Sequence, residues 1–213
     1  MTTDAILTLT QWLSPGFPVG AFAYSHGLET AIETGAITSV DDLETWVTDL
    51  ISQGGGRSDI IILSSAYHAN PHVLHQVDET ARAFAASAER LLETEQQGAA
   101  FCRTVDAVWG TALGACTYPV AVGRAACAQA IPLELTAQMY LHAFAANLIS
   151  AAVRLVPLGQ TEGQVLLAKL APLIRSTAKT AVSDQLHDLH SHCFAADIAA
   201  MQHEVQYSKV FRT

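Results

Sequence analysis

Hydrophobic residues recur along most of the chain with the period of three to four residues that is typical of an α-helix. The clearest case follows Ser39, where a Ser-Val-Asp-Asp motif resembles a capping box with Asp in place of Glu. The apolar stripe behind it consists of Leu43, Trp46, Val47, Leu50 and Ile51. Alanine occurs 36 times and β-branched runs are scarce, which also favours helix. We therefore predict an all-α, single-domain bundle of about ten helices over residues 1–213, with no significant sheet.

The ends of these helices are predicted from capping residues, glycines and prolines. A loop with two prolines and two glycines spans Ser14–Gly20, Gly35 closes the second helix, and a kink is expected near Pro172. Ile60–Leu63 is the only strand-like run, and we interpret it as a buried helical turn behind a Ser58 cap. The expected helices cover about residues 4–13, 21–34, 40–53, 58–68, 71–88, 88–110, 119–130, 133–156, 160–178 and 184–201.

Composition narrows the class of protein. Half of the residues are hydrophobic and 15% are charged, so a partner or a second copy is expected to cover apolar surface. The net charge of −9 lies mostly in residues 1–60, which argues against nucleic-acid binding and leaves open a solvated acidic surface or a docking face for a basic partner. The apolar segment Met139–Val156 contains His142, Asn147 and Arg154, so it predicts a core helix and not a membrane span. The absence of a signal-like start and of paired cysteines predicts a cytoplasmic protein.

Two histidine clusters could bind a transition metal. His68, His72 and His75 have helical spacing, but Pro71 interrupts the helix, so a solvated helix junction is the competing interpretation. The second cluster comprises His187, His190, His192 and Cys193. A helix surface or a subunit contact is the competing interpretation there.

Other chemical motifs are weak. The Gly-Gly-Gly run at 54–56 lacks the lysine and the hydroxyl residue of a phosphate-binding loop. No spacing of Ser, His and Asp indicates a nucleophile with its base, and no catalytic residues are predicted. Arg154, within an apolar helix, is expected to meet a buried acid or a backbone carbonyl.

Two segments are unlike ordinary bundle sequence. The opening motif, residues 14–29, reads Ser14-Pro-Gly-Phe-Pro-Val-Gly-Ala-Phe-Ala-Tyr-Ser-His-Gly-Leu-Glu29. The tail motif, residues 197–213, reads Asp197-Ile-Ala-Ala-Met-Gln-His-Glu-Val-Gln-Tyr-Ser-Lys-Val-Phe-Arg-Thr213. A chain end with so many aromatic, basic and amide side chains is expected to be anchored by something.

Together these motifs closely resemble those of the urease accessory protein F family (UreF). Tyr118-Pro-Val-Ala-Val-Gly123 and Ala151-Ala-Val-Arg-Leu-Val-Pro-Leu-Gly-Gln160 also resemble that family, so the resemblance covers essentially the whole chain. It implies an all-α homodimer without enzymatic activity. It also implies a complex with the D-type (also called H-type) accessory protein, the G-type GTPase and apo-urease. No cofactor would be tightly bound, and nickel would transit the assembled complex.

The resemblance also implies which residues meet partners. Phe22 matches a family aromatic implicated in contacting the GTPase, and the tail, residues 202–213, is expected to become ordered against the D-type partner. Lys209 and Gln202 stand where the family commonly has arginine, and lysine lacks the planar fork for bidentate contacts. The predicted partner-binding residues are Pro18, Gly20, Phe22, Tyr24, His203, Glu204, Tyr207, Lys209, Phe211 and Arg212. The alternative function is a stand-alone, histidine-based nickel-binding chaperone, and a hydrolase with an unrecognised site is a third possibility.

Overall fold

The computed structural model describes residues 3–156 and 158–212, and every regular element in these ranges is a helix. The prediction of an all-α fold with about ten helices is confirmed. The elements are α1 (Thr3–Trp12), η1 (Ala21–Ala23), α2 (Leu28–Glu33), α3 (Val40–Gln53), α4 (Gly55–His68), α5 (Pro71–Ala83), α6 (Ala88–Trp109), α7 (Tyr118–Ala128), α8 (Leu133–Leu155), α9 (Gln160–Ala181), η2 (Leu186–Asp188) and α10 (Phe194–His203), where η marks a 3₁₀ helix.

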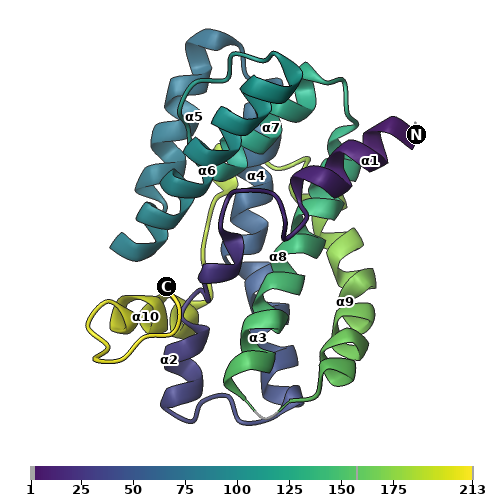
Figure 1. Ribbon diagram of the computed structural model, residues 1–213. Helices are drawn as coiled ribbons and strands as arrows, with labels where there is room; N and C mark the ends of the chain where they lie inside the picture. Colours follow the sequence, from purple (N-terminus) through teal and green to yellow (C-terminus); the bar gives the residue numbers. More distant parts are fainter. Residues whose placement is uncertain (1–2, 157, 213) are drawn as a thin grey trace.

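Helix α4 lies at the centre of the bundle, in contact with α3, α5, α7, α8 and α9 (Figure 1). Its buried Ile60, Ile61 and Leu63 make it apolar on most sides, as a central helix must be. Helices α5, α6 and α7 lie together at one end, whereas α2 and α10 pack against each other at the other end. One continuous cluster of buried side chains extends from Ala5 to Phe211.

Several predicted helix boundaries are correct. Ser39 Oγ accepts the Asp42 amide at 3.2 Å, and the Asp42 carboxylate accepts the Ser39 amide at 3.0 Å, so the capping box is present. Asn70 caps α5 ahead of Pro71, and Gly110 ends α6 in a left-handed conformation. Helix α9 continues through Pro172 to Ala181.

The predicted helix over 21–34 is wrong. After the turn η1 the chain is extended at Tyr24, and His26 and Gly27 both adopt positive φ before α2 begins at Leu28. The side chains of Tyr24 and His26 bond to α6, and these tertiary contacts override the local helix propensity.

The predicted helix over 184–201 is also wrong. Residues 189–193 are non-helical, and α10 occupies 194–203. Contacts to the α3–α4 junction hold this segment: the His192 amide donates to the Gln53 carbonyl at 3.0 Å, and Arg57 binds Asp184 at 2.6 Å. Helix α4 begins at Gly55, not behind Ser58. None of the helices in the described ranges has the length and hydropathy to span a bilayer.

Candidate functional site

The opening motif and the tail motif lie against each other, although about 170 residues separate them. The Glu29 carboxylate accepts the amides of Val210 at 2.7 Å and Phe211 at 2.8 Å. The Arg212 amide donates to the Ala23 carbonyl at 2.8 Å. A carboxylate that accepts two backbone N–H groups fixes the path of an otherwise irregular segment. The opening motif is therefore what anchors the end of the chain.

His203 is fully buried between two carboxylates. Its Nδ1 lies 2.6 Å from Glu89 Oε2 on α6, and its Nε2 lies 3.3 Å from Glu29 Oε2 on α2. Each ring nitrogen of His203 therefore faces one carboxylate oxygen. Lys209 Nζ donates to the other Glu89 oxygen at 2.7 Å. We call Glu29, Glu89, His203 and Lys209 the tail joint, because these four side chains connect α2, α6, α10 and the tail.

A second buried polar group lies beside the tail joint. Arg90 bonds to Glu93 and to His26, whose ring also stacks edge-on against Phe144. Burial raises the pKa of Glu93, but the positive charge of Arg90 and the bond to His26 outweigh it and lower that pKa to about 2. Burial, helped by Arg90, lowers the pKa of His26. The pair Arg90–Glu93 is therefore ionised beside a neutral imidazole.

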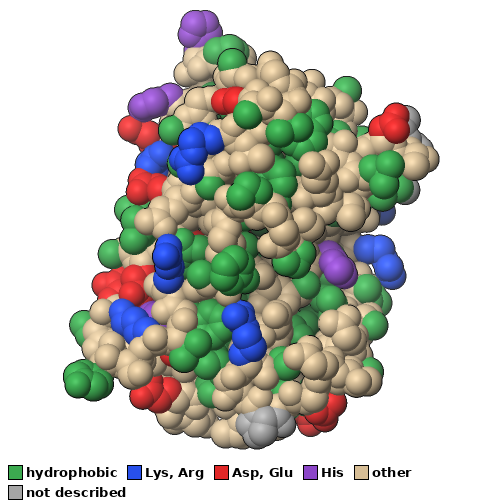
Figure 2. Space-filling view, in the orientation of Figure 1, with side chains coloured by type: hydrophobic (Ala, Val, Ile, Leu, Met, Phe, Trp, Pro, Cys, Tyr) green, Lys and Arg blue, Asp and Glu red, His purple; other side chains and the backbone are tan. Residues whose placement is uncertain are grey.

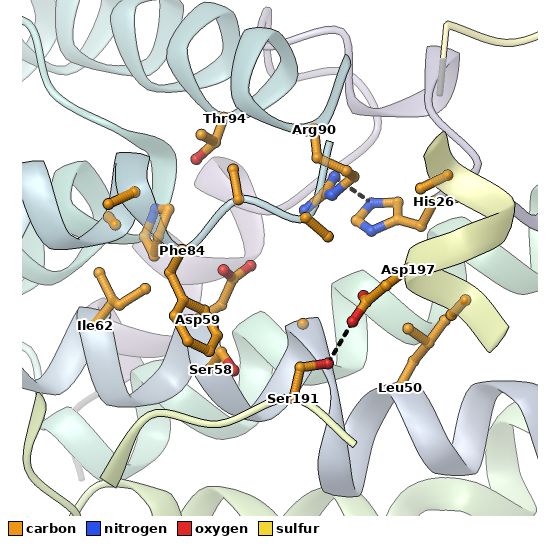
Figure 3. Close-up of a pocket in the computed structure, with 18 of the residues that line it drawn as sticks. His26, Leu50, Ser58, Asp59, Ile62, Phe84, Arg90, Thr94, Ser191 and Asp197 are labelled. Atoms are coloured by element: carbon orange, nitrogen blue, oxygen red, sulfur yellow. Dashed lines mark hydrogen bonds between the residues drawn. The ribbon is translucent and has the colours of Figure 1, made fainter. Parts of the chain in front are cut away.

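Arg90 and His26 border a cavity of about 410 Å³ between α4, α6 and α10 (Figure 3). Figure 3 shows Asp59, Arg90, His26 and Asp197 arranged around it, with Ser191 bonded to Asp197. Tyr140 donates its hydroxyl to Asp59 at 2.8 Å. Burial raises the pKa of Asp59 to about 6, despite the opposing effects of Arg90 and Tyr140.

Asp59 should make the stability of the protein depend on pH. Its folded pKa of about 6 exceeds the ordinary 3.8, so the folded state binds this proton more tightly, and stability falls as pH rises from about 4 to 6. Asp59→Asn keeps an acceptor for Tyr140 and removes the charge. We expect the variant to be more stable than the wild type by about 2 kcal/mol above pH 6 and nearly equal at pH 4.

Urea unfolding at pH 4 and pH 7.5 measures this difference. Asp41→Asn, at an exposed position on α3, is the matched control and should change little at either pH. If Asp59→Asn lowers the free energy of unfolding equally at both pH values, the pKa of Asp59 is not raised in the folded protein.

A surface cleft of about 520 Å³ opens on the other side of the opening motif. Phe22 stands at it with 58% of its surface exposed, and Tyr24 below donates its hydroxyl to Gln96 of α6 at 3.1 Å. Arg154 of α8 donates to the Phe22 carbonyl at 3.0 Å and lies 4.5 Å from the centre of the Phe211 ring. The expectation that Arg154 meets a backbone carbonyl is confirmed, although the residue is exposed and not buried. Pro18, Gly20, Arg103 and Arg212 also line the cleft.

Helix α10 presents an apolar stripe to solvent. Phe194, Ile198 and Met201 of α10 follow one another at helical spacing, Val205 lies in the turn just after the helix, and each is at least half exposed. Tyr207 and Val210 in the tail are exposed as well. On the face that carries the tail, hydrophobic side chains alternate with Lys and Arg (Figure 2). Such an uncovered apolar stripe is typical of a docking surface.

The ten predicted site residues fall into two groups. Pro18, Phe22, Glu204, Tyr207, Lys209 and Arg212 are exposed, whereas Tyr24, His203 and Phe211 are buried and Gly20 is intermediate. The three buried residues hold the opening and tail motifs in place within the chain itself. Contact of any of the ten residues with a partner stays a prediction. Glu204 accepts the Ala88 amide at the start of α6 at 2.7 Å.

The sequence analysis did not predict that polar residues of α6 belong to the candidate site. Glu89, Glu93 and Gln97 lie at intervals of four residues and therefore share one helix face, which was the available signal. Asp59 carried no such signal, because only the bundle brings it beside Arg90.

The histidine clusters do not converge. His68 ends α4 while His72 and His75 lie on α5, and His187 is exposed on η2. His190 and His192 lie near each other, but the Cys193 thiol donates to the Asp49 carbonyl at 3.1 Å. Within residues 3–156 and 158–212, no three His, Cys, Asp or Glu side chains are placed to hold a metal ion.

These features define a class of protein: an all-helical bundle in which a buried polar joint shapes two exposed surfaces. Comparison with known proteins gives the family. The UreF family model matches residues 37–171, and the chain belongs to the UreF family.

Relatives of similar length support this assignment. The chain is 62% identical to urease accessory protein UreF of Roseobacter denitrificans over 213 residues, which cover all of this chain and 96% of that protein. The UreF proteins of Ruegeria pomeroyi and Cereibacter sphaeroides are 51% and 50% identical, over 100% and 98% of this chain and 98% and 99% of their own lengths. The resemblance inferred from the motifs is thus confirmed, as is the expectation of an accessory protein and not an enzyme.

Proposed function

We propose that this chain bridges a D-type (or H-type) accessory protein and the G-type GTPase, and so assists delivery of nickel to apo-urease. The observation that supports a bridge is that the tail joint connects two separate exposed surfaces. The cleft around Phe22 and the stripe on α10 both rest on residues of the opening and tail motifs. Nickel is then a cargo of the assembled complex and not a resident cofactor of this chain.

The two surfaces differ in chemistry, which suits two different partners. The stripe on α10 is apolar and suits burial in a groove of the D-type protein. The cleft combines the aromatic Phe22 with Arg103 and Arg212, which suits an acidic edge of the GTPase. A partner that binds one of the two surfaces would also affect the other surface, because the tail joint connects the cleft to the stripe on α10.

Further parts of the proposal concern the state of the chain. We propose that it acts as one domain, because a single buried cluster contains residues from Ala5 to Phe211. We also propose that it acts as a homodimer in the cytoplasm, where a fold with four free thiols needs no structural disulfide. Exposed apolar side chains outside the two surfaces, such as Leu7 on α1 and Val165 on α9, are available for a second copy.

The alternative, a stand-alone nickel chaperone, needs His187, His190, His192 and Cys193 to converge on a metal. Their separation in the described residues gives that function no support. Nickel titration of the isolated chain would still revive it if a triple alanine variant at His187, His190 and Cys193 lost affinity.

Co-expression with the D-type and G-type proteins, followed by pull-down and size exclusion, tests the bridge. Phe22→Ala should lose the GTPase but keep the D-type partner, because the aromatic anchor of the cleft is removed. Met201→Asp should lose the D-type partner, because a charge enters the apolar stripe. We expect each loss to be at least tenfold in affinity, or about 1.4 kcal/mol.

Val73→Asp is the matched control. It places the same charge at an exposed apolar position on α5, away from α10 (Figure 1), and should bind both partners. Point variants are sharper than truncation of the tail, because truncation also removes the buried His203 and Phe211. If the wild-type chain binds neither partner, the bridging function is wrong.

A further inference from the structure

The four cysteines have very different surroundings. Cys127 is exposed on α7, and the Cys193 thiol is bonded to the Asp49 carbonyl. Cys102 and Cys116, in contrast, face each other with their Sγ atoms 3.6 Å apart. Both are buried, with 3% and 7% of their surfaces exposed. Two thiols are thus in contact inside the bundle.

The backbone around these thiols is already closely packed. Cys102 lies on α6, and Cys116 lies in the segment between α6 and α7. A Cβ atom at Gly98, one turn before Cys102, would stand only 2.0 Å from the Cys116 carbonyl oxygen, so only glycine permits this approach. The Thr117 amide donates to Asp78 at 2.7 Å, which holds the segment from its other side. The two thiols are therefore kept together by the fold and not by chance side-chain rotation.

A covalent bond needs only a small further movement. An S–S bond is about 2.05 Å long, so the sulfurs would have to approach by roughly 1.5 Å. Residues 110–115 of the connecting segment are half-buried or exposed and form no helix. A segment without regular structure can follow this movement, and its exposure leaves a short path from solvent to Cys116 for a small oxidant.

The two thiols also differ in acidity in the way the reaction requires. The hydrogen bond from Cys116 lowers the pKa of the Cys102 thiol. The same bond, together with burial, raises the pKa of the Cys116 thiol. Cys102 is therefore the better thiolate nucleophile, and Cys116 remains a thiol that can attack Cys102 once Cys102 is oxidised.

We propose that Cys102 and Cys116 form a redox-modification site at which a hydroperoxide oxidises the two thiols to a disulfide. The Cys102 thiolate attacks the distal peroxide oxygen, the O–O bond breaks, and water or an alcohol leaves while Cys102 becomes a sulfenic acid. Cys116 sulfur then attacks the Cys102 sulfur, the S–O bond breaks, and a second water leaves with the Cys116 proton. The peroxide gains two electrons and the dithiol loses two.

The disulfide would stiffen the part of the protein that holds the candidate site. It would tie α6 to the start of α7, and α6 carries Glu89 of the tail joint and Gln96 of the cleft. Closing a loop of this length limits the unfolded chain more than the folded one, so oxidation should stabilise the protein. A dithiol reductant should reverse the effect.

Hydrogen peroxide added to the reduced, folded full-length chain tests the proposal. A Cys127→Ser background removes the exposed thiol that could react between molecules. We expect a mass loss of about 2 Da and a tryptic product that joins residues 91–103 to residues 104–124. We also expect the melting temperature to rise by roughly 5 to 10 °C and to return after reduction.

Cys102→Ser in the same background is the control and should show neither change. Cys193→Ser, which removes the other buried thiol, should behave like its parent. A gain of about 16 or 32 Da without the joined peptides would overturn the proposal, because it would show that Cys116 does not respond. A disulfide that forms only in denaturant would also overturn the proposal. The same holds if Cys102 and Cys116 do not react under conditions that oxidise Cys127 in the wild-type chain.

Discussion

Replacing Gly27 with alanine is expected to lower the free energy of unfolding by about 4 kcal/mol, the largest effect of any variant considered for this protein. Two causes add. Gly27 has φ of 76°, a left-handed conformation that costs a side-chain-bearing residue about 1 kcal/mol or more. A Cβ atom would also lie 2.7 Å from the Ala200 amide nitrogen and 3.0 Å from the Ala196 carbonyl oxygen, so α10 would have to move away from α2.

Urea unfolding followed by circular dichroism measures the loss, and Gly55→Ala is the matched control. Gly55 begins α4, a Cβ atom added there would meet nothing within 4 Å, and its φ is ordinary. Alanine there should be neutral or stabilise the helix by up to about 1 kcal/mol. A Gly27→Ala protein as stable as the wild type would mean that α2 and α10 do not pack this closely.

Glu29→Gln is expected to lower the free energy of unfolding by about 3 kcal/mol. The carboxylate accepts the amides of Val210 and Phe211, and it lies 3.3 Å from Nε2 of the His203 ring. Glutamine keeps one acceptor oxygen and puts an amide N–H group opposite a donor in a buried place. Losing bonds to a charged acceptor and leaving a donor unpaired each cost roughly 1 to 3 kcal/mol, and the two effects overlap.

Hydrogen exchange at Val210 and Phe211 gives a second measurement of the same variant. We expect both amides to exchange at least tenfold faster, because their acceptor is lost. Glu33→Gln, one turn further along α2 and exposed, is the control and should alter neither stability nor exchange. Unchanged exchange in Glu29→Gln would show that the tail is anchored by Phe211 packing alone.

Both variants test the same physical idea about how a urease accessory protein can present two surfaces. The tail has little regular structure of its own after His203, so its position depends on Glu29 and on the burial of Phe211. A buried arrangement of charges contributes little net stability compared with apolar packing, but it enforces one geometry when every charge has a partner. We infer that the tail joint fixes the relation of the cleft to the α10 stripe at some cost in stability.

Much of the architecture could be predicted from local chemistry. The capping box at Ser39, the Asn70-Pro71 start and the stop at Gly110 act within one helical turn, so sequence reasoning located them well. The unusual composition of the opening and tail motifs also singled out these two segments, and the family followed from them.

The sequence by itself thus determined an all-helical fold, its approximate helices and its family, because helix periodicity and capping are local and the two motifs are long. Only the tertiary structure decided that residues 21–27 and 184–193 are not α-helical, since His26, Arg57 and His192 gain more from bonds to distant elements than from helix continuation. It alone placed Glu29 beside His203, Asp59 beside the cavity, and Cys102 against Cys116. Burial, and with it the altered pKa of Asp59, Cys102 and Cys116, depends on which elements pack together, and no local pattern carries that information.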